Sequence, residues 1–110
     1  MSSAMSHQVL DRVNADQDRR IAAIIRSDPR KLRVARTNLE RWMAADGKRV
    51  RPAFLEWHAV LHRLTAREIA AFLCSETPLA RRLRQSSPMA GILGEAERLA
   101  IRKRCEKAGA

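Results

Sequence analysis

Aromatic residues, glycine and proline are all scarce in this chain of 110 residues. Tyrosine is absent, and the aromatic side chains are limited to Trp42, Phe54, Trp57 and Phe72. We assign all four to the core, which leaves none free to stack on nucleotide bases and disfavours a single-strand stacking platform. Four glycines and four prolines interrupt the chain, and strand-like alternation is rare. This pattern predicts a helical protein.

Cysteine is also scarce, and long apolar runs are absent. Cys74 and Cys105 have no paired spacing, which favours a reducing compartment with two free thiols over a disulfide framework. The first seven residues contain neither the basic segment nor the apolar segment of a secretory signal, so we expect no such signal. No apolar run approaches the roughly 20 residues of a membrane span. We therefore expect a cytoplasmic protein without a membrane partner.

Signatures of catalysis and cofactor binding are missing as well. Gly91 and Gly94 have neither the spacing nor the strand context of a phosphate-binding loop, and no nucleophile elbow surrounds Ser86 and Ser87. His58 and His62 lie one turn apart, but a zinc site needs three or four ligands. We expect no catalytic residues, no cofactor and no metal, and hence a protein that is not an enzyme.

Positive charge is what the chain has in excess. The formal net charge is +10, with an apolar fraction of 45% that is typical of a folded chain. Residues 29–51 carry eight Lys or Arg against two acids, and residues 76–110 carry eight against four. Such a balance favours an anionic partner, although a basic surface that is merely solvated is the alternative.

Helix start and stop signals divide the chain into one domain, residues 1–110, that we expect to be an all-α bundle of five to six helices with short loops. Asp28-Pro29 starts a helix, Gly47 ends it, and Thr65 with Glu68 forms a capping box. The expected helices cover about residues 6–26, 29–45, 52–64, 65–74, 77–85 and 95–107. Leu79 and Leu83 are expected to point inward, and Ile92 and Leu93 to return to the core.

The two terminal helices carry the weakest apolar faces. The stripe on residues 6–26 is thin, and Leu99 and Ile101 point to different faces of residues 95–107. We therefore expect a core within about residues 29–93 and terminal helices that face a protein partner. The partner-binding residues expected from this pattern are Leu10, Val13, Ile21, Ile24, Ile101 and Cys105. Such stripes are also compatible with a homodimer.

Residues 65–85 resemble a helix-turn-helix DNA-binding motif. Ala70 is the small residue at the helix crossing, and the second helix carries Arg81, Arg82 and Arg84 for phosphates or guanine. Cys74 and Pro78 depart from the usual turn and recognition helix. Nucleic-acid contacts are thus expected from Arg33, Arg41, Arg81, Arg82 and Arg84, and an ordinary pair of packed helices is the alternative.

A ribonuclease is a further alternative. Arg51 and His58, with six residues between them, resemble the Arg-spacer-His motif of HEPN-type ribonucleases, in which the pair performs acid–base chemistry on RNA. Pro52 places Arg51 just outside the helix, and one short pattern does not define a site.

One longer resemblance covers roughly residues 29–105. Residues 80–93 followed by Glu95-Ala96-Glu97-Arg98, together with Trp42 and the pair Glu56-Trp57, resemble small helical bacterial proteins of toxin–antitoxin or defence loci. A phenylalanine often replaces Met89 there. The resemblance implies a non-catalytic antitoxin that neutralises a cognate toxin enzyme by direct binding, and antitoxins often bind their own operator DNA. The alternatives remain a helix-turn-helix regulator and a HEPN-like ribonuclease toxin.

Overall fold

The computed structural model describes residues 6–109, and this part of the chain contains helices and no strands. The elements in chain order are α1 (His7–Ser27), the 3-10 helix η1 (Pro29–Lys31), α2 (Leu32–Asp46), α3 (Pro52–Arg63), α4 (Ala66–Leu73), α5 (Pro78–Leu83), the 3-10 helix η2 (Arg84–Ser86) and α6 (Glu95–Gly109). The predicted all-α bundle is confirmed, and each predicted helix corresponds to an observed one.

Local sequence signals set the helix ends. Asp28 accepts a hydrogen bond from the Arg30 backbone N–H at 3.3 Å and begins η1. Gly47 ends α2 with a φ of 65°, which favours glycine. Thr65 and Glu68 form the predicted capping box at the start of α4, with hydrogen bonds of 2.9 and 3.2 Å.

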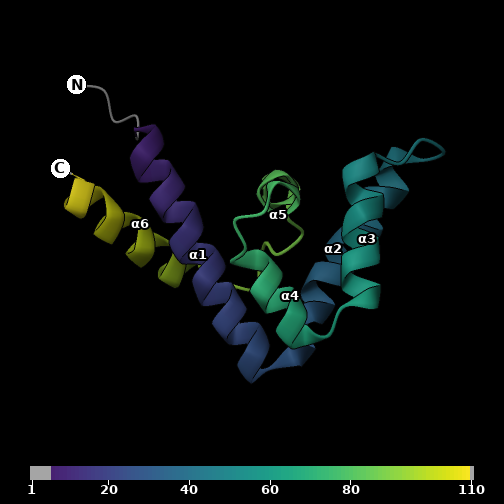
Figure 1. Ribbon diagram of the computed structural model, residues 1–110, viewed down its shortest axis with the longest axis horizontal. Coiled ribbons are helices and arrows are strands. Elements are labelled where there is room, and N and C mark those ends of the chain that lie inside the picture. Colours follow the sequence, from purple (N-terminus) through teal and green to yellow (C-terminus); the bar gives the residue numbers. More distant parts are fainter. Residues whose placement is uncertain (1–5, 110) are drawn as a thin grey trace.

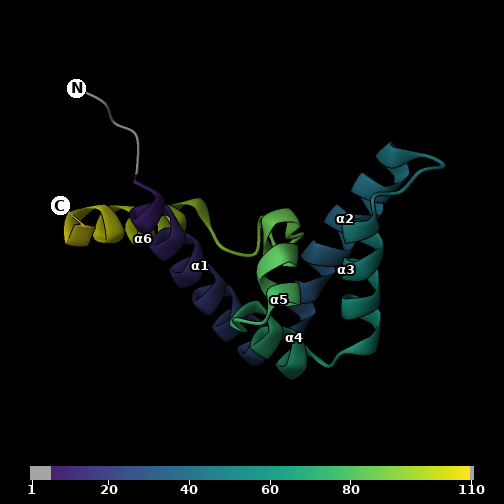
Figure 2. The ribbon, with the colours of Figure 1, turned by 45° about the horizontal axis from the view of Figure 1, so that its top comes forward.

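α1 packs against α4 and α6, whereas α2 packs against α3. In Figures 1 and 2, α6 lies against α1 at one end of the molecule, the α2–α3 pair forms the other end, and α4 and α5 lie between them. An ion pair of 2.8 Å joins Arg20 to Glu97, and the backbone of Gly109 lies against Val9, so α6 runs back along α1 in the opposite direction.

Two buried polar groups fix the centre of the fold. The Trp57 indole N–H donates to the Leu83 carbonyl at 2.8 Å and ties α3 to α5. The buried Asn38 amide on α2 donates to the Pro88 and Ala90 carbonyls at 2.9 and 2.8 Å. These bonds satisfy groups that burial would otherwise leave unpaired, and they hold the segment 87–93 onto α2.

The predicted core, about residues 29–93, was too short, because α1 and α6 both contribute to it. Val13, Ile21, Ile101 and Cys105 are buried, although the sequence assigned them to a partner-facing surface. The apolar residues predicted on this helix do not include Ala22 and Ile25, which are fully buried and widen its apolar face. Tertiary packing of α1 against α4 and α6 therefore uses the residues that looked available for a partner.

Other predicted positions divide between core and surface. Phe54 and Trp57 are buried, Trp42 and Phe72 pack against the core, and Ile92 and Leu93 return to it as predicted. Leu79 was predicted to point inward, but this is wrong, because its side chain is 45% exposed on the first turn of α5. The two cysteines are free thiols, with Cys74 exposed and Cys105 buried.

Candidate functional site

In the segment that resembles a helix-turn-helix, residues 65–85, the arginines of the second helix form ion pairs with carboxylates of the protein itself. α5 has six residues, and its Arg82 donates to both carboxylate oxygens of Glu56 on α3, at 3.0 and 2.6 Å. Arg81 lies 3.9 Å from Glu76. A recognition helix needs side chains that reach outward to base edges, and these two already lie in ion pairs.

Arg84 is less exposed than Arg81 and Arg82 and makes more contacts within the protein. Its side chain is 18% exposed and donates to the carbonyls of Leu73, at 3.2 Å, and Ser75. It also lies 3.8 Å from the carboxylates of Asp18 and Glu76. The guanidinium therefore satisfies carbonyls at the C-terminal end of α4, where a helix leaves acceptors unpaired. A nucleic acid could recruit Arg84 only by breaking these contacts.

Arg33 and Arg41, by contrast, lie together on an exposed face of α2. They are eight residues apart with Thr37 midway, so the three side chains form one ridge of the helix. Both arginines are exposed, and neither forms an ion pair with a carboxylate of residues 6–109. Arg41 donates to the Asn38 side-chain oxygen at 3.0 Å, which orients its guanidinium beside the helix.

A shallow hollow adjoins this ridge. Its volume is about 550 Å³, and Arg30, Lys31, Arg33 and Thr37 are among the residues that line it. Asp28, also in the lining, is paired with Arg30 at 3.0 Å. Lys31 and Arg33 form no ion pair with a carboxylate of the described residues, so the lining of the hollow carries a net positive charge. We use the name α2 basic face for Lys31, Arg33, Thr37 and Arg41.

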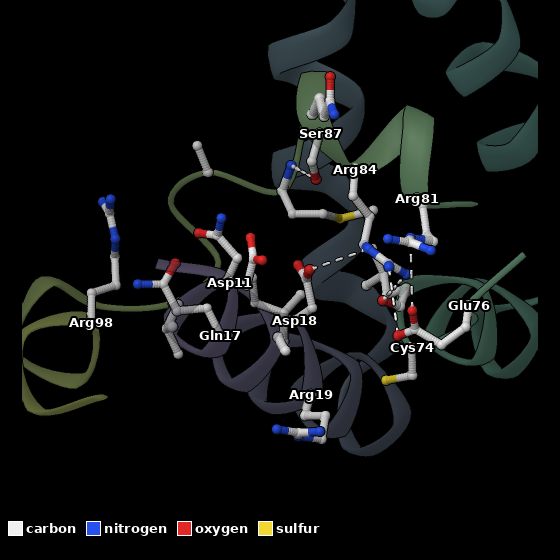
Figure 3. Close-up of a pocket in the computed structure, with 18 of the residues that line it drawn as sticks. Asp11, Gln17, Asp18, Arg19, Cys74, Glu76, Arg81, Arg84, Ser87 and Arg98 are labelled. Carbon is white, nitrogen blue, oxygen red and sulfur yellow. Dashed lines mark hydrogen bonds and ion pairs between the residues drawn. The ribbon is translucent and has the colours of Figure 1, made fainter. Parts of the chain in front are cut away.

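A second and larger concavity lies on α1, with a volume of about 890 Å³. The α1 wall contributes Asp11, Asn14 and Asp18, and the opposite wall comes from the α4–α5 turn, α5, η2 and residues 87–93, with Arg98 of α6 also in the lining. Figure 3 shows Asp18 pointing from α1 toward Arg84, whereas Arg19 points away on the other side. We call this concavity the α1 groove.

Asp18 is the most perturbed ionisable group in the α1 groove. Burial raises the pKa of its carboxyl from 3.8 to about 6, and the nearby Arg84 guanidinium opposes this rise only in part. The side chain is 17% exposed, and within the described residues its carboxylate accepts no hydrogen bond. A buried carboxylate without hydrogen bonds destabilises the folded state and marks a functional-site candidate.

Sequence reasoning missed Asp18. The prediction for residues 6–26 rests on their thin apolar stripe and does not use their polar positions. The spacing of Asp11, Asn14 and Asp18 by three and four residues was nevertheless visible and predicts a polar face on one side of α1. What the sequence did not provide was the second wall, which comes from residues about 60 to 80 positions later in the chain.

Arg51 and His58, the pair that resembles the HEPN motif, each contact other side chains. Arg51 forms an ion pair of 3.3 Å with Asp46, and its guanidinium lies 5.1 Å from the centre of the Phe54 ring. His58 stacks on His62 with ring centres 4.0 Å apart on exposed positions of α3. Among residues 6–109, no group of three or more metal-ligating side chains comes together.

Two further findings complete the description. None of the helices among the described residues is long and apolar enough to span a membrane. Comparison of the chain with protein-family models, curated proteins and solved structures finds no match.

Proposed function

We propose that this protein is a non-catalytic nucleic-acid-binding protein that contacts phosphate groups through the α2 basic face. The observation that carries the proposal is the ridge of Arg33, Thr37 and Arg41 beside a hollow lined by Lys31, all exposed and free of ion pairs with described carboxylates. Arginine and lysine on one helix face bind a phosphate backbone without reading its sequence.

Charge distribution along α2 supports this assignment. The turn that follows the helix adds Lys48 and Arg49, which are exposed and form no ion pair within residues 6–109. Glu40 is the acid of α2 that lacks a basic partner there, because Asp46 pairs with Arg51. Over residues 29–51 as a whole, eight basic residues therefore stand against two acids, which favours a polyanionic partner.

The test compares two pairs of arginines. Fluorescence anisotropy of a labelled duplex at several salt concentrations gives the affinity and its salt slope. We expect Arg33→Ala with Arg41→Ala to weaken binding about tenfold or more and to reduce the salt slope by about 2, one per lost phosphate contact. The matched control, Arg81→Ala with Arg82→Ala, removes the same charge from α5 and should change both quantities less.

The opposite result would reassign the interface. If the α5 pair abolishes binding and the α2 pair does not, the helix-turn-helix interpretation of residues 65–85 is the better one. Equal losses from both pairs would indicate that total charge alone determines the affinity, and the α2 basic face would then have no special role.

A protein partner, such as the toxin enzyme that the resemblance implies, is the second candidate. It is favoured by the exposure of Leu10 on α1 and Leu99 on α6, at 42% and 49%, on the two helices assigned to a partner. Leu10→Glu with Leu99→Glu should abolish recovery of the toxin from its native host by the tagged protein. Recovery unchanged by these substitutions excludes this surface.

A further inference from the structure

Two histidines stack on an exposed side of α3. The rings of His58 and His62 have their centres 4.0 Å apart, with an angle of 24° between their planes. The two residues are one helical turn apart, and both are exposed. Their side chains therefore leave the helix in the same direction, and solvent reaches both rings.

A backbone hydrogen bond determines which nitrogen of His62 is free to bind a ligand. Its Nδ1 lies 2.9 Å from the His58 carbonyl oxygen. A carbonyl oxygen only accepts, so Nδ1 donates and carries the proton of the neutral ring. The free lone pair of His62 is then on Nε2. Metal-binding histidines in proteins have this arrangement, in which one ring nitrogen donates to a carbonyl or carboxylate and the other binds the ion.

The distance between the two rings suits a shared metal ion. Imidazole nitrogens bind ions such as Zn²⁺ at about 2.0–2.1 Å, so two of them on one ion lie about 3 Å apart. Ring centres at 4.0 Å are close enough for side-chain rotation to bring one nitrogen of each ring to this separation. The helix backbone need not move, because two histidines four residues apart on one helix face are a known arrangement for binding zinc.

The charges around the pair favour a cation in part. His62 lies in the last turn of α3, and the C-terminal end of a helix carries partial negative charge. Arg63 follows it, and Arg36 of α2 donates to the Leu61 carbonyl at 3.5 Å. Both arginines are exposed, so solvent and salt screen their repulsion of an ion, whereas the metal–nitrogen bonds act directly at bonding distance.

We propose that His58 and His62 together bind one divalent transition-metal ion, with Cu²⁺ preferred over Ni²⁺ and Zn²⁺. Nitrogen ligands bind divalent ions of the first transition row in this order. Since no group of three metal-ligating side chains forms within residues 6–109, water would occupy the remaining positions of the ion. The sequence predicted no metal because a zinc site needs three or four ligands, a requirement that does not apply to an open site with two. The proposal is independent of phosphate binding by the α2 basic face.

The experiment is a titration of the full chain with Cu²⁺, Zn²⁺ and Mg²⁺ in a buffer that does not bind metals, slightly above neutral pH. Calorimetry gives the affinity and stoichiometry, and NMR locates the ion because paramagnetic Cu²⁺ broadens nearby amide signals. We expect one ion per chain, broadening centred on residues 58–62, and an affinity at least about tenfold higher for Cu²⁺ than for Zn²⁺. Mg²⁺, which prefers oxygen ligands, should not bind there. Broadening centred elsewhere, equal affinities for the three ions, or two chains per ion overturns the proposal.

Substitutions test whether the two histidines act as a pair. His58→Ala and His62→Ala should each lower the affinity for Cu²⁺ at least about tenfold, because either one removes a metal–nitrogen bond. His7→Ala, which removes the third histidine of the chain, on α1, is the control and should leave the affinity unchanged.

A swap of neighbouring residues tests the spacing without a change in composition or net charge. His62→Arg with Arg63→His moves the second histidine about 100° around the helix, away from His58. We expect the same loss of affinity for Cu²⁺ as in His62→Ala, and circular dichroism shows that each variant is folded. Full affinity in the swapped variant, or a loss caused by His7→Ala and not by the α3 substitutions, overturns the proposal.

Discussion

The buried polar side chains of this protein differ in how many of their hydrogen-bonding groups have a partner. Asn38 is buried and uses both its amide donors and its carbonyl oxygen, so it stabilises the contact between α2 and residues 87–93. Asp18 is largely buried as well, but it has only a distant guanidinium as a partner. Burial is therefore compensated at Asn38 and remains costly at Asp18.

The cost at Asp18 gives a prediction about stability and pH. A folded-state pKa of about 6, against 3.8 for an unperturbed carboxyl, corresponds to a penalty on the order of 2–3 kcal/mol at neutral pH. We expect Asp18→Asn to raise the free energy of unfolding at pH 7 by about 1–2 kcal/mol, less than the full penalty because the amide of asparagine is itself a polar group whose burial has a cost. Urea unfolding measures this difference.

The sign of the pH dependence follows from the direction of the pKa shift. Because the pKa is higher in the folded state, the folded protein binds the proton more tightly, and the carboxyl stabilises it increasingly as the pH falls from about 7 towards 4. The Asn variant has no such group, so its advantage should shrink over this range and vanish near pH 4. An advantage that is constant with pH would show that the carboxyl is not perturbed.

At the scale of whole elements, α1 is the helix on which the fold depends most. The sequence indicated a thin stripe that would need a partner, whereas the structure buries Val13, Ile21, Ala22 and Ile25 against the rest of the chain. α6 has a poor apolar pattern and is nevertheless held by two buried side chains four residues apart, Ile101 and Cys105. Both terminal helices are thus structural elements of the bundle.

Deletion of α1 tests this conclusion. Removal of residues 1–28 should abolish cooperative unfolding, because the deletion exposes the α1-facing sides of α4 and α6 and loses several large apolar side chains. Circular dichroism during urea titration measures the transition. The control is Leu10→Ser, an exposed position on the same helix, which should change the stability by less than about 0.5 kcal/mol. A cooperative transition in the 29–110 fragment would contradict this view.

At the scale of the molecule, the dominant feature is an excess of positive charge on a small body. Ion pairs such as Arg82–Glu56 and Arg20–Glu97 neutralise part of it, but the formal net charge is still +10. Repulsion among the remaining charges opposes the compact state. The same excess provides the field that a polyanionic partner would experience.

Screening of this repulsion should stabilise the protein. We expect the melting temperature to rise by a few degrees when sodium chloride increases from about 20 mM to about 300 mM, because the Debye length falls below the distances between like charges. Thermal unfolding followed by circular dichroism measures the change. A melting temperature that falls with salt would show that the surface ion pairs outweigh the general repulsion.

The helices themselves were determined by local sequence. Caps at Asp28 and Thr65, the stop at Gly47 and the prolines that begin α3 and α5 act within a few residues, so helix positions could be read from the chain. The excess of basic residues along α2 was equally visible, since adjacent positions on one helix face are set by helical periodicity alone.

The pairing of charges was decided only by the tertiary structure. In the sequence, nothing distinguishes Arg82 and Arg84 from Arg33 and Arg41 as arginines without an acidic partner. In the fold, Arg82 pairs with Glu56 of α3 and Arg84 lies near Asp18 of α1. The α1 groove likewise needs two walls that are distant in sequence. Periodicity along a helix reports which side chains share a face, whereas contacts between helices depend on how the faces pack, and that information lies in the fold as a whole.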